Sequence, residues 1–372
     1  MKNLNIILLS FAMLTFSVSF GQYNQEAKGK NRIYTTETVK QAVLDEKGEE
    51  VLDSSGAVLT EDVEVEVQVE GDSFGNANGS EFDLATDGAF TGNTVAVLHL
   101  YTGEGFDFEE PKAALEQKGF SVFRWINNPP SAEELKLQLE NASQLWVISD
   151  ASRKLNDEHA EVIKEFFESG KGLYIWGDNS PYYADANFLC QKIFNTTMDG
   201  NTWAGKVVKV SGEAENRAGI VEGHLISTGV SNMYEGITVA TVTATQELSP
   251  LIYGSEDNLI AAVYEQDGKR AIIDGGFTRL YYSWDSAGTH RYVKNAASWL
   301  VNYERFGELV YQNQEEDLDT DDEKEPELEE IKKEDDKDSG NNGGDVIIKN
   351  ADVIRNELLE FNGNVLIKDV KN

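Results

Sequence analysis

Cysteine is almost absent from this sequence, and Cys190 is the only one in 372 residues. An internal disulfide is therefore excluded, and the fold must be held by a hydrophobic core, which a chain of this length can bury. Histidine is also scarce, with four widely separated residues that form no metal-ligand pattern. We therefore expect no metal site and no other cofactor.

Positive charge is scarce as well. The chain holds 32 Lys and Arg against 66 Asp and Glu, which gives a formal net charge of −34. A chain this acidic repels nucleic acid and anionic membranes, so we expect neither as a partner. The expected partner is a saccharide or another protein, and the oligomeric state is left open.

Long hydrophobic runs are lacking except at the N-terminus. Lys2 precedes an apolar stretch at 6–20, and Ser19-Phe20-Gly21 gives a small-x-small cleavage site. This run of about 15 residues is shorter than the roughly 20 that span a membrane. We expect residues 1–21 to be a signal peptide, with a retained anchor as the alternative. The mature chain would then be exported, periplasmic or extracellular, without a membrane span.

The polar regions at both ends differ from the middle of the chain. Residues 22–93 are polar and glycine-rich, although valines alternate with polar residues over 63–69, the period of a half-buried strand. We expect this region to be partly β or disordered, with a linker at 71–92. Residues 305–344 form an acidic linker that is expected to be disordered, because 315–338 contains fifteen acids and four lysines. Residues 345–372 form a small C-terminal segment.

One stretch of the acidic linker resembles the start of a calcium-binding EF-hand loop. Asp317, Asp319 and Asp321 alternate as such a loop requires, but Asp322 and Leu328 replace its glycine and glutamate. A solvated linker is the better interpretation, and loose calcium binding remains the alternative.

The globular body is expected at 94–304. Apolar runs at 95–101, 144–149 and 172–176 alternate with helical patterns, including those at 131–139 and 156–169. Strands of this kind belong to a parallel sheet covered on both faces. We also expect a hairpin that joins 259–265 to 269–274, and a closing helix at 292–303. Ligands of such sheets bind at the carboxyl ends of the strands.

The most informative stretch is the strand, polar turn and helix at 171–193. Many α/β hydrolytic enzymes place a nucleophile at such a turn. Here the turn offers Asp178, Asn179 and Ser180, and no cysteine. Two further segments follow it in the chain, His224-Leu-Ile-Ser-Thr-Gly229 and Gly268-Lys-Arg-Ala-Ile-Ile-Asp-Gly275.

In their order, these three segments resemble the class I glutamine amidotransferase-like superfamily in its trehalose-utilisation-type branch. The resemblance covers about 94–301 and implies an α/β, flavodoxin-like three-layer sandwich with a mainly parallel sheet. It also implies a catalytic cysteine at the turn, which this chain lacks. Cys190 lies about three helical turns further on and is interpreted as a buried hydrophobe.

A dense polar and aromatic cluster at 274–291 follows a buried strand, so we expect it at the same sheet edge. Arg279 is suited to clamp a carboxylate or phosphate, and His290 to act as a general base. Tyr282 and Trp284 are candidates for a stacking wall. The alternative is a helix-entry loop whose side chains have structural roles. The candidate catalytic residues are Asp178, Ser180 and His290, and the candidate ligand-binding residues are Asn179, Tyr182, Asp185, Arg279, Tyr282 and Trp284.

Three functions remain open. The first is a secreted, non-catalytic binding or interaction protein on an amidotransferase-like scaffold. The second is a hydrolase of a carbohydrate or amide substrate that uses Asp178 or Ser180 with His290. The third is a structural surface component recruited through 345–372. The remaining histidines are assigned no role, because His99 is expected in the core and His159 on a solvated helix face.

Overall fold

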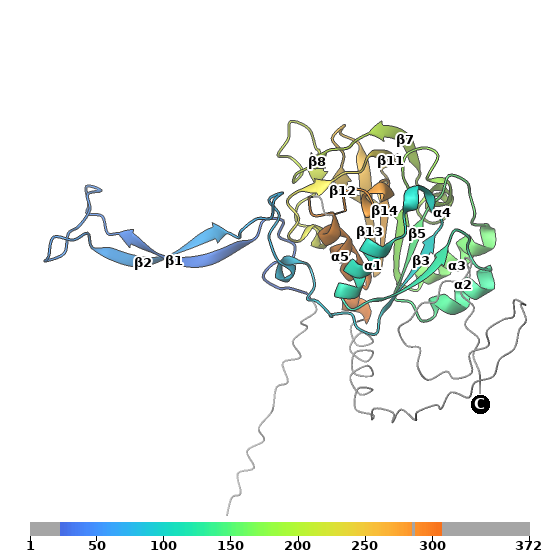
Figure 1. Ribbon diagram of the computed structural model, residues 1–372, viewed down its shortest axis with the longest axis horizontal. Coiled ribbons are helices and arrows are strands. Elements are labelled where there is room, and N and C mark those ends of the chain that lie inside the picture. Colours follow the sequence, from blue (N-terminus) through green and yellow to red (C-terminus); the bar gives the residue numbers. More distant parts are fainter. Residues whose placement is uncertain (1–22, 285–286, 307–372) are drawn as a thin grey trace, which may run out of the picture.

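The computed structural model describes residues 23–284 and 287–306 (Figure 1). The expected signal peptide, the C-terminal segment and nearly all of the acidic linker lie outside these residues. Within the part that is described, no helix is both long and apolar enough to cross a bilayer.

The described residues contain fourteen strands, five α-helices and four short 3-10 helices. The strands are β1 (Tyr34–Ala42), β2 (Thr60–Gln68), β3 (Thr94–His99), β4 (Ser121–Ile126), β5 (Gln144–Ile148), β6 (Gly172–Trp176), β7 (Met198–Trp203), β8 (Val207–Val208), β9 (Gly219–Ile220), β10 (Met233–Tyr234), β11 (Thr238–Val242), β12 (Leu248–Tyr253), β13 (Leu259–Gln266) and β14 (Lys269–Asp274). The α-helices are α1 (Glu109–Gln117), α2 (Ala132–Leu139), α3 (Asp157–Glu168), α4 (Ala184–Phe194) and α5 (Thr289–Leu300), and the 3-10 helices are η1 (Ser80–Phe82), η2 (Gly103–Gly105), η3 (Leu225–Ser227) and η4 (Phe277–Leu280).

A central sheet of eight strands organises the body in the order β4-β3-β5-β6-β14-β13-β12-β9. The first five of these strands are parallel, while β13, β12 and β9 continue the sheet in antiparallel pairs. In chain order the parallel strands follow the 2-1-3-4-5 arrangement of flavodoxin-like folds. β13 and β14 are the two strands of the expected hairpin, and β14 has the expected bounds.

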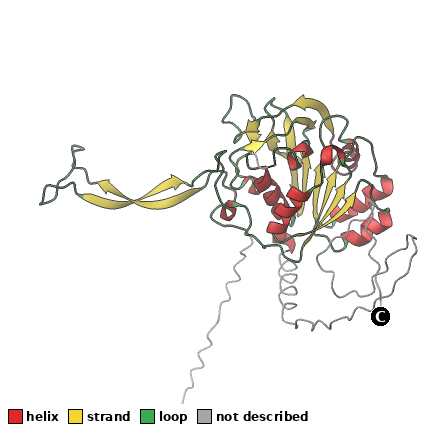
Figure 2. Ribbon diagram, in the orientation of Figure 1, coloured by secondary structure: helices red, strands yellow, loops and turns green. Residues whose placement is uncertain are grey.

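Helices cover both faces of this sheet (Figure 2). Because successive side chains of a strand point to opposite faces, Val95 and Val97 belong to a core that includes α1 and α5. Ala96 and Leu98 belong to a second core, which includes α2, α3 and α4. The result is the expected α/β three-layer sandwich, so the sequence-based prediction of the fold class is confirmed.

Residues 71–92 do not form the linker that their composition suggested. Leu84 and Phe90 are fully buried in the same core as α5, and the amide of Leu84 donates to the side chain of Asn295. The Asp83 carboxylate is also fully buried and pairs with Arg291, Lys118 and Lys294. Glycine and serine richness therefore misled the prediction, because the ion pairs that fix this segment are formed by residues remote in the chain.

Residues 34–68, which we call the arm, form an antiparallel hairpin of β1 and β2 that projects from the body (Figure 1). The predicted alternation is present, because Val63, Val65 and Val67 are half-buried and the residues between them are exposed. Within the described residues, the two strands pair only with each other.

Two expected helix starts carry side-chain caps. Ser131 accepts the amide of Glu134 at the start of α2, and Asn156 accepts the amide of His159 at the start of α3. The prediction that His159 is solvated was wrong. Its ring completes the capping box, since Nδ1 accepts the Asn156 amide at 3.2 Å and Nε2 lies 2.7 Å from the carbonyl oxygen of Pro130.

Candidate functional site

The turn that follows β6 places Asp178 at the carboxyl edge of the sheet, as expected. Its side chain is only 1% exposed. Oδ1 accepts the backbone amide of Asn179 at 2.7 Å, and Oδ2 accepts that of Thr278 at 2.8 Å. Burial raises the pKa of this carboxyl to about 7, although these hydrogen bonds oppose the rise. Asp178 therefore joins the β6 turn to η4, with both oxygens occupied.

The neighbours of Asp178 turn toward the surface. Ser180 is exposed, and its backbone amide donates to the carbonyl of Gly200 in β7. The side-chain oxygen of Asn179 accepts the hydroxyl of Thr238 in β11 at 2.8 Å. Tyr182 is half-buried and packs edge-on against Tyr101, with ring centroids 5.3 Å apart. The turn therefore contacts β7 and β11 on one side and an aromatic cluster on the other.

Asp185, which was predicted to bind ligand, is fully buried and holds a neighbouring loop in place. Oδ1 accepts the amides of Lys154 and Leu155 at 2.7 and 2.8 Å. Burial raises the pKa of this carboxyl, partly offset by the same bonds. These contacts give Asp185 a structural role at the end of β5.

Arg279 was predicted to clamp a ligand, but its partner lies within the protein. The side chain is fully buried, and Nη1 lies 2.6 Å from Oδ2 of Asp274 at the end of β14. Nη2 donates to the carbonyl oxygen of Glu235 at 2.9 Å. Burial alone would lower the pKa of Arg279, but the Asp274 carboxylate outweighs it and the pKa is raised. The charge of Arg279 is therefore already compensated within the protein.

Two tyrosines complete the surroundings of Asp274. The hydroxyl groups of Tyr292 and Tyr174 lie 2.9 and 3.2 Å from Oδ2 and are 3.0 Å from each other. Burial raises the pKa of both phenols well above its ordinary value, so both hydroxyls stay protonated and able to donate. Burial also raises the pKa of Asp274, which Arg279 opposes. The network is fully buried, and within it Arg279 Nε has no hydrogen-bond partner.

Gly275, directly after Asp274, allows β14 to pack closely against β11. Gly275 lies so close to β11 that a Cβ atom there would be 2.5 Å from the carbonyl oxygen of Ala240. Its own carbonyl accepts the amide of Ala240 at 2.8 Å. The close approach that glycine allows is therefore made by a neighbouring strand.

The remaining predicted residues are spread over the end of the cluster. Trp284 is 7% exposed and belongs to the core, whereas Tyr282 is 50% exposed. His290 is half-buried in the first turn of α5. With 3.6 residues per turn, it projects about 200° away from Tyr292, whose hydroxyl faces Asp274. His290 thus leaves α5 in a direction different from that of the buried network.

Sequence reasoning missed the residues that matter most here. Asp274 ends an apolar strand and is followed by two glycines, and this position in the sequence could have identified it as a candidate. Tyr174 and Tyr292 gave no signal, because they occur where any buried aromatic residue would. A further surface residue was missed: Trp203 in β7 is 71% exposed.

Trp203 lies beside the turn after β6. It pairs directly with Thr238 across β7 and β11, and opposite residues of an antiparallel pair project on the same face. The Thr238 hydroxyl is the group that donates to Asn179. An exposed indole, a hydroxyl and a carboxamide therefore adjoin on one surface.

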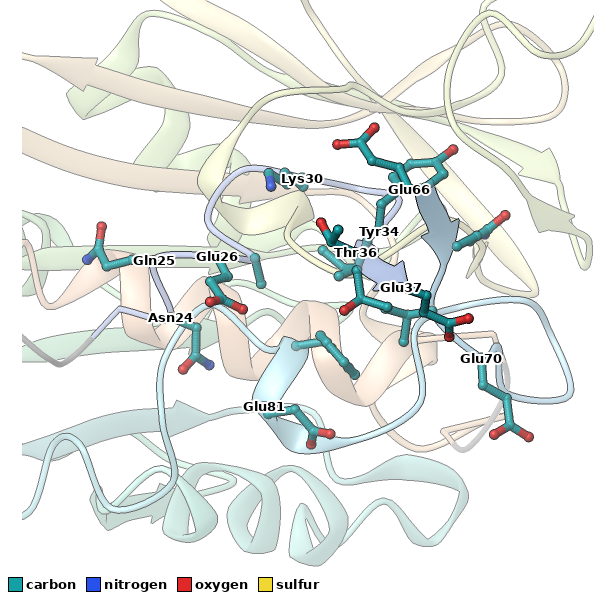
Figure 3. A pocket seen from close by; sticks show the side chains of 16 residues that line it. Asn24, Gln25, Glu26, Lys30, Tyr34, Thr36, Glu37, Glu66, Glu70 and Glu81 are labelled. Atoms are coloured by element: carbon teal, nitrogen blue, oxygen red, sulfur yellow. The ribbon is translucent and has the colours of Figure 1, made fainter. Parts of the chain in front are cut away.

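A groove of about 900 Å³ lies elsewhere, at the base of the arm (Figure 3). Five glutamates and one lysine supply its charged side chains, namely Glu26, Glu37, Glu66, Glu70, Glu81 and Lys30. None of the predicted site residues lines it. In the described residues, no group of three or more His, Cys, Asp and Glu side chains is arranged to hold a metal ion.

Cys190 is fully buried in α4, as its sequence context suggested. Burial raises the pKa of the thiol. A thiol of this kind is a poor nucleophile, because the reactive form is the thiolate.

No protein-family model matches the sequence, and no curated protein matches it. Solved structures similar to the chain include a cytoplasmic protein from Salmonella typhimurium LT2, with 13% identity, a TM-score of 0.38, and coverage of 56% of this chain and 96% of that one. Another is a ThuA-like protein from Parabacteroides merdae, with 11% identity, a TM-score of 0.38, and coverage of 56% and 89%. A third is the glutaminase domain of Trypanosoma brucei CTPS with bound acivicin, with 11% identity, a TM-score of 0.31, and coverage of 55% and 93%. The assignment of this chain to the flavodoxin-like α/β class rests on its own strand order and layers.

Proposed function

We propose that this chain is an exported, non-catalytic binding protein built on an amidotransferase-like scaffold. The proposal rests chiefly on Asp178. It occupies the turn where a nucleophile would be expected, yet it is buried and both its oxygens accept backbone amides. A carboxylate with both oxygens engaged and almost no exposed surface has no access to a substrate.

The surroundings of Asp178 support the same proposal. The charge of Arg279 is compensated by Asp274, and aromatic rings fill the edge in front of β3, where Tyr101 packs on Phe277 with ring centroids 4.9 Å apart. Tyr281 stacks on Phe106 at 4.6 Å. Because aromatic rings fill this sheet edge, we place ligand binding on the neighbouring surface instead.

The surface formed by Trp203, Thr238 and Asn179 is where we place ligand binding. Saccharides are bound by an aromatic face together with hydroxyl and amide groups, and an indole edge serves protein contacts equally well. This surface therefore suits either a saccharide or a protein as the ligand.

A titration separates the two classes. Isothermal titration calorimetry would measure the binding of soluble oligosaccharides to the mature chain and to Trp203→Ala. Saturable binding that Trp203→Ala abolishes supports a saccharide ligand, whereas no binding to the wild-type chain favours a protein. Phe74→Ala serves as the control, because Phe74 is also an exposed aromatic residue.

The alternative function is a hydrolase that uses Asp178 or Ser180 with His290. One observation favours it, namely the pKa of Asp178 near neutrality, which suits a general acid or base. Turnover would be measured on glutamine and on nitrophenyl glycosides and esters, with the wild-type chain, Ser180→Ala and His290→Ala. The binding proposal expects no turnover above buffer. Turnover that His290→Ala abolishes while leaving thermal stability unchanged establishes the hydrolase instead.

Export has its own test. A chain expressed with residues 1–21 in a Gram-negative host is expected in the periplasm or medium, with Gln22 as its first residue. N-terminal sequencing of the cell fractions checks this, and an intact Met1 in the exported fraction would establish the retained anchor.

A further inference from the structure

The arm offers apolar surface that the described residues leave partly exposed. Val39 pairs with Val63 across the hairpin, and Val65 and Val67 continue the same face. A hairpin of only two strands is marginally stable in water, because it has no second layer to bury such a face. The valine face is therefore available to a partner.

The tip of the arm has a built structure rather than a simple loop. Three residues spaced eight apart join in a ring of backbone bonds, since the amide of Val43 donates to Leu59, that of Leu59 to Val51 and that of Val51 to Val43. Tight turns fill the two intervening segments. Asp45 accepts the amides of Lys47 and Glu49, and Asp53 accepts those of Ser55 and Ala57.

This ring presents large apolar side chains to solvent. Leu52 and Leu44 are 58% and 54% exposed, and Leu59 and Val58 are 44% and 39% exposed. Because the backbone around them is already fixed, little conformational entropy is lost when they dock. Preorganised apolar side chains at the end of a projecting hairpin are suited to enter a pocket of another molecule.

The negative charge of the arm indicates which kind of surface it can bind. Residues 34–68 contain ten acidic side chains and two lysines, and the groove at the base of the arm adds further glutamates. Two such arms repel each other, so a second copy is a poor occupant. An anionic surface is repelled for the same reason, whereas a cationic surface is attracted and steered.

We propose that the arm docks onto a partner protein whose apolar strip or pocket is bordered by lysine and arginine side chains. The leucines at the tip and the valine face supply the apolar contact. Glu37, which is opposite Val65, and Glu61, two residues before Val63, lie on the same face as the valines and supply the charge contact. This inference deepens the proposed binding function and rests on it, but it concerns the arm and not the surface around Trp203.

The test uses the mature chain and a labelled peptide of alternating leucine and lysine, with binding followed by fluorescence anisotropy. Leu44→Ser/Leu52→Ser is expected to weaken binding about tenfold or more, because two half-exposed leucines lose their burial. Leu137→Ser in α2 is the matched control, since Leu137 is 57% exposed on the body. It is expected to bind as the wild type does.

A second pair of variants tests the charge. Glu37→Lys/Glu61→Lys on the valine face of the arm and Glu133→Lys/Glu161→Lys on helices α2 and α3 change the net charge equally, and all four glutamates are exposed. Only the arm variant is expected to lose affinity strongly and to show a weaker dependence on salt.

Several results would overturn the proposal. These are wild-type affinity in Leu44→Ser/Leu52→Ser, equal binding of a serine–lysine peptide, or equal losses in the two charge variants. Self-association that the leucine variant abolishes would assign the tip to a second copy, and binding to phosphatidylcholine vesicles would assign it to a membrane. None of these measurements reports turnover, so the non-catalytic proposal is judged separately.

Discussion

Asp83 and Arg291, 208 residues apart in the chain, form a buried ion pair in which Arg291 Nε lies 2.6 Å from Oδ1 of Asp83. Lys118 and Lys294 lie 2.8 and 2.7 Å from the other oxygen. Burial would raise the pKa of Asp83, but these three cations outweigh it and hold the pKa below its usual range. One carboxylate thus fixes the segment that follows the arm to α1 and α5.

Removal of this carboxylate is expected to be costly. Asp83→Asn removes the buried carboxylate that three buried cations share, and such a loss destabilises a protein by about 3–5 kcal/mol. Urea unfolding of the mature chain measures this. Asp87→Asn is the control, because Asp87 also contacts Lys118 but is largely exposed, and its loss is expected to cost less than about 1 kcal/mol. Equal losses in the two variants would contradict the role assigned to Asp83.

The network around Asp274 gives a second stability prediction. Tyr292→Phe removes a hydrogen bond to a buried carboxylate without creating a cavity, and we expect a loss of about 1.5–3 kcal/mol. Tyr281→Phe removes an exposed bond to Glu104 and is expected to cost less than about 1 kcal/mol. Equilibrium unfolding compares the two, and a neutral Tyr292→Phe would show that the network adds little.

Asp178 predicts a pH dependence. Its pKa is raised from 3.8 to about 7 in the folded state, so its contribution to stability is fully present below pH 3.8 and is lost as the pH rises through 7. The Asp178→Asn variant has no carboxyl at this position and therefore does not lose stability in this way as the pH rises. The destabilisation of the variant relative to wild type is therefore expected to shrink by up to about 4 kcal/mol between pH 4 and 8. A constant difference over that range would show that Asp178 does not titrate there.

His99 predicts an opposite slope. It packs against Phe106 and Phe108, and burial together with Arg124 lowers its pKa from 6.5 to about 4. The folded state binds this proton less readily than the unfolded state, so stability is full above pH 6.5 and is lost as the pH falls toward 4. His99→Leu is expected to be less sensitive to acid, as thermal unfolding at stepped pH would measure. An unchanged slope would rule out His99 as the source.

The strands of the body were predictable because they are buried on both faces. β6 and β14 have the predicted bounds, since both are apolar runs bounded by glycine or a polar residue. β9 and β10 contain two residues each, too few to show a period. β12 was missed because Ser249 and Pro250 interrupt its apolar pattern, which is tolerated because both are exposed.

The candidate site was predictable in place but not in detail. The sequence put Asp178 and Arg279 at one sheet edge, and in the structure Asp178 contacts Thr278 there and Arg279 contacts Asp274 at the end of β14. It gave no indication that each would find its partner inside the protein, because Asp274, Thr278 and Tyr292 are brought together only by the fold. The hydrogen-bond and ion-pair partners of a side chain depend on the tertiary structure, whereas its position at a sheet edge follows from the order of the strands.

The attachment of the arm has a mechanical consequence. Arg291 pairs with Asp83 and also donates to the carbonyl oxygens of Ala77 and Gly79, just beyond β2. A pulling force applied at the tip would pass along two strands into these contacts and then into α5, which packs against β14. The arm is thus anchored in a helix that covers the central sheet, and tension on it would load the buried ion pairs before it could unfold the sheet.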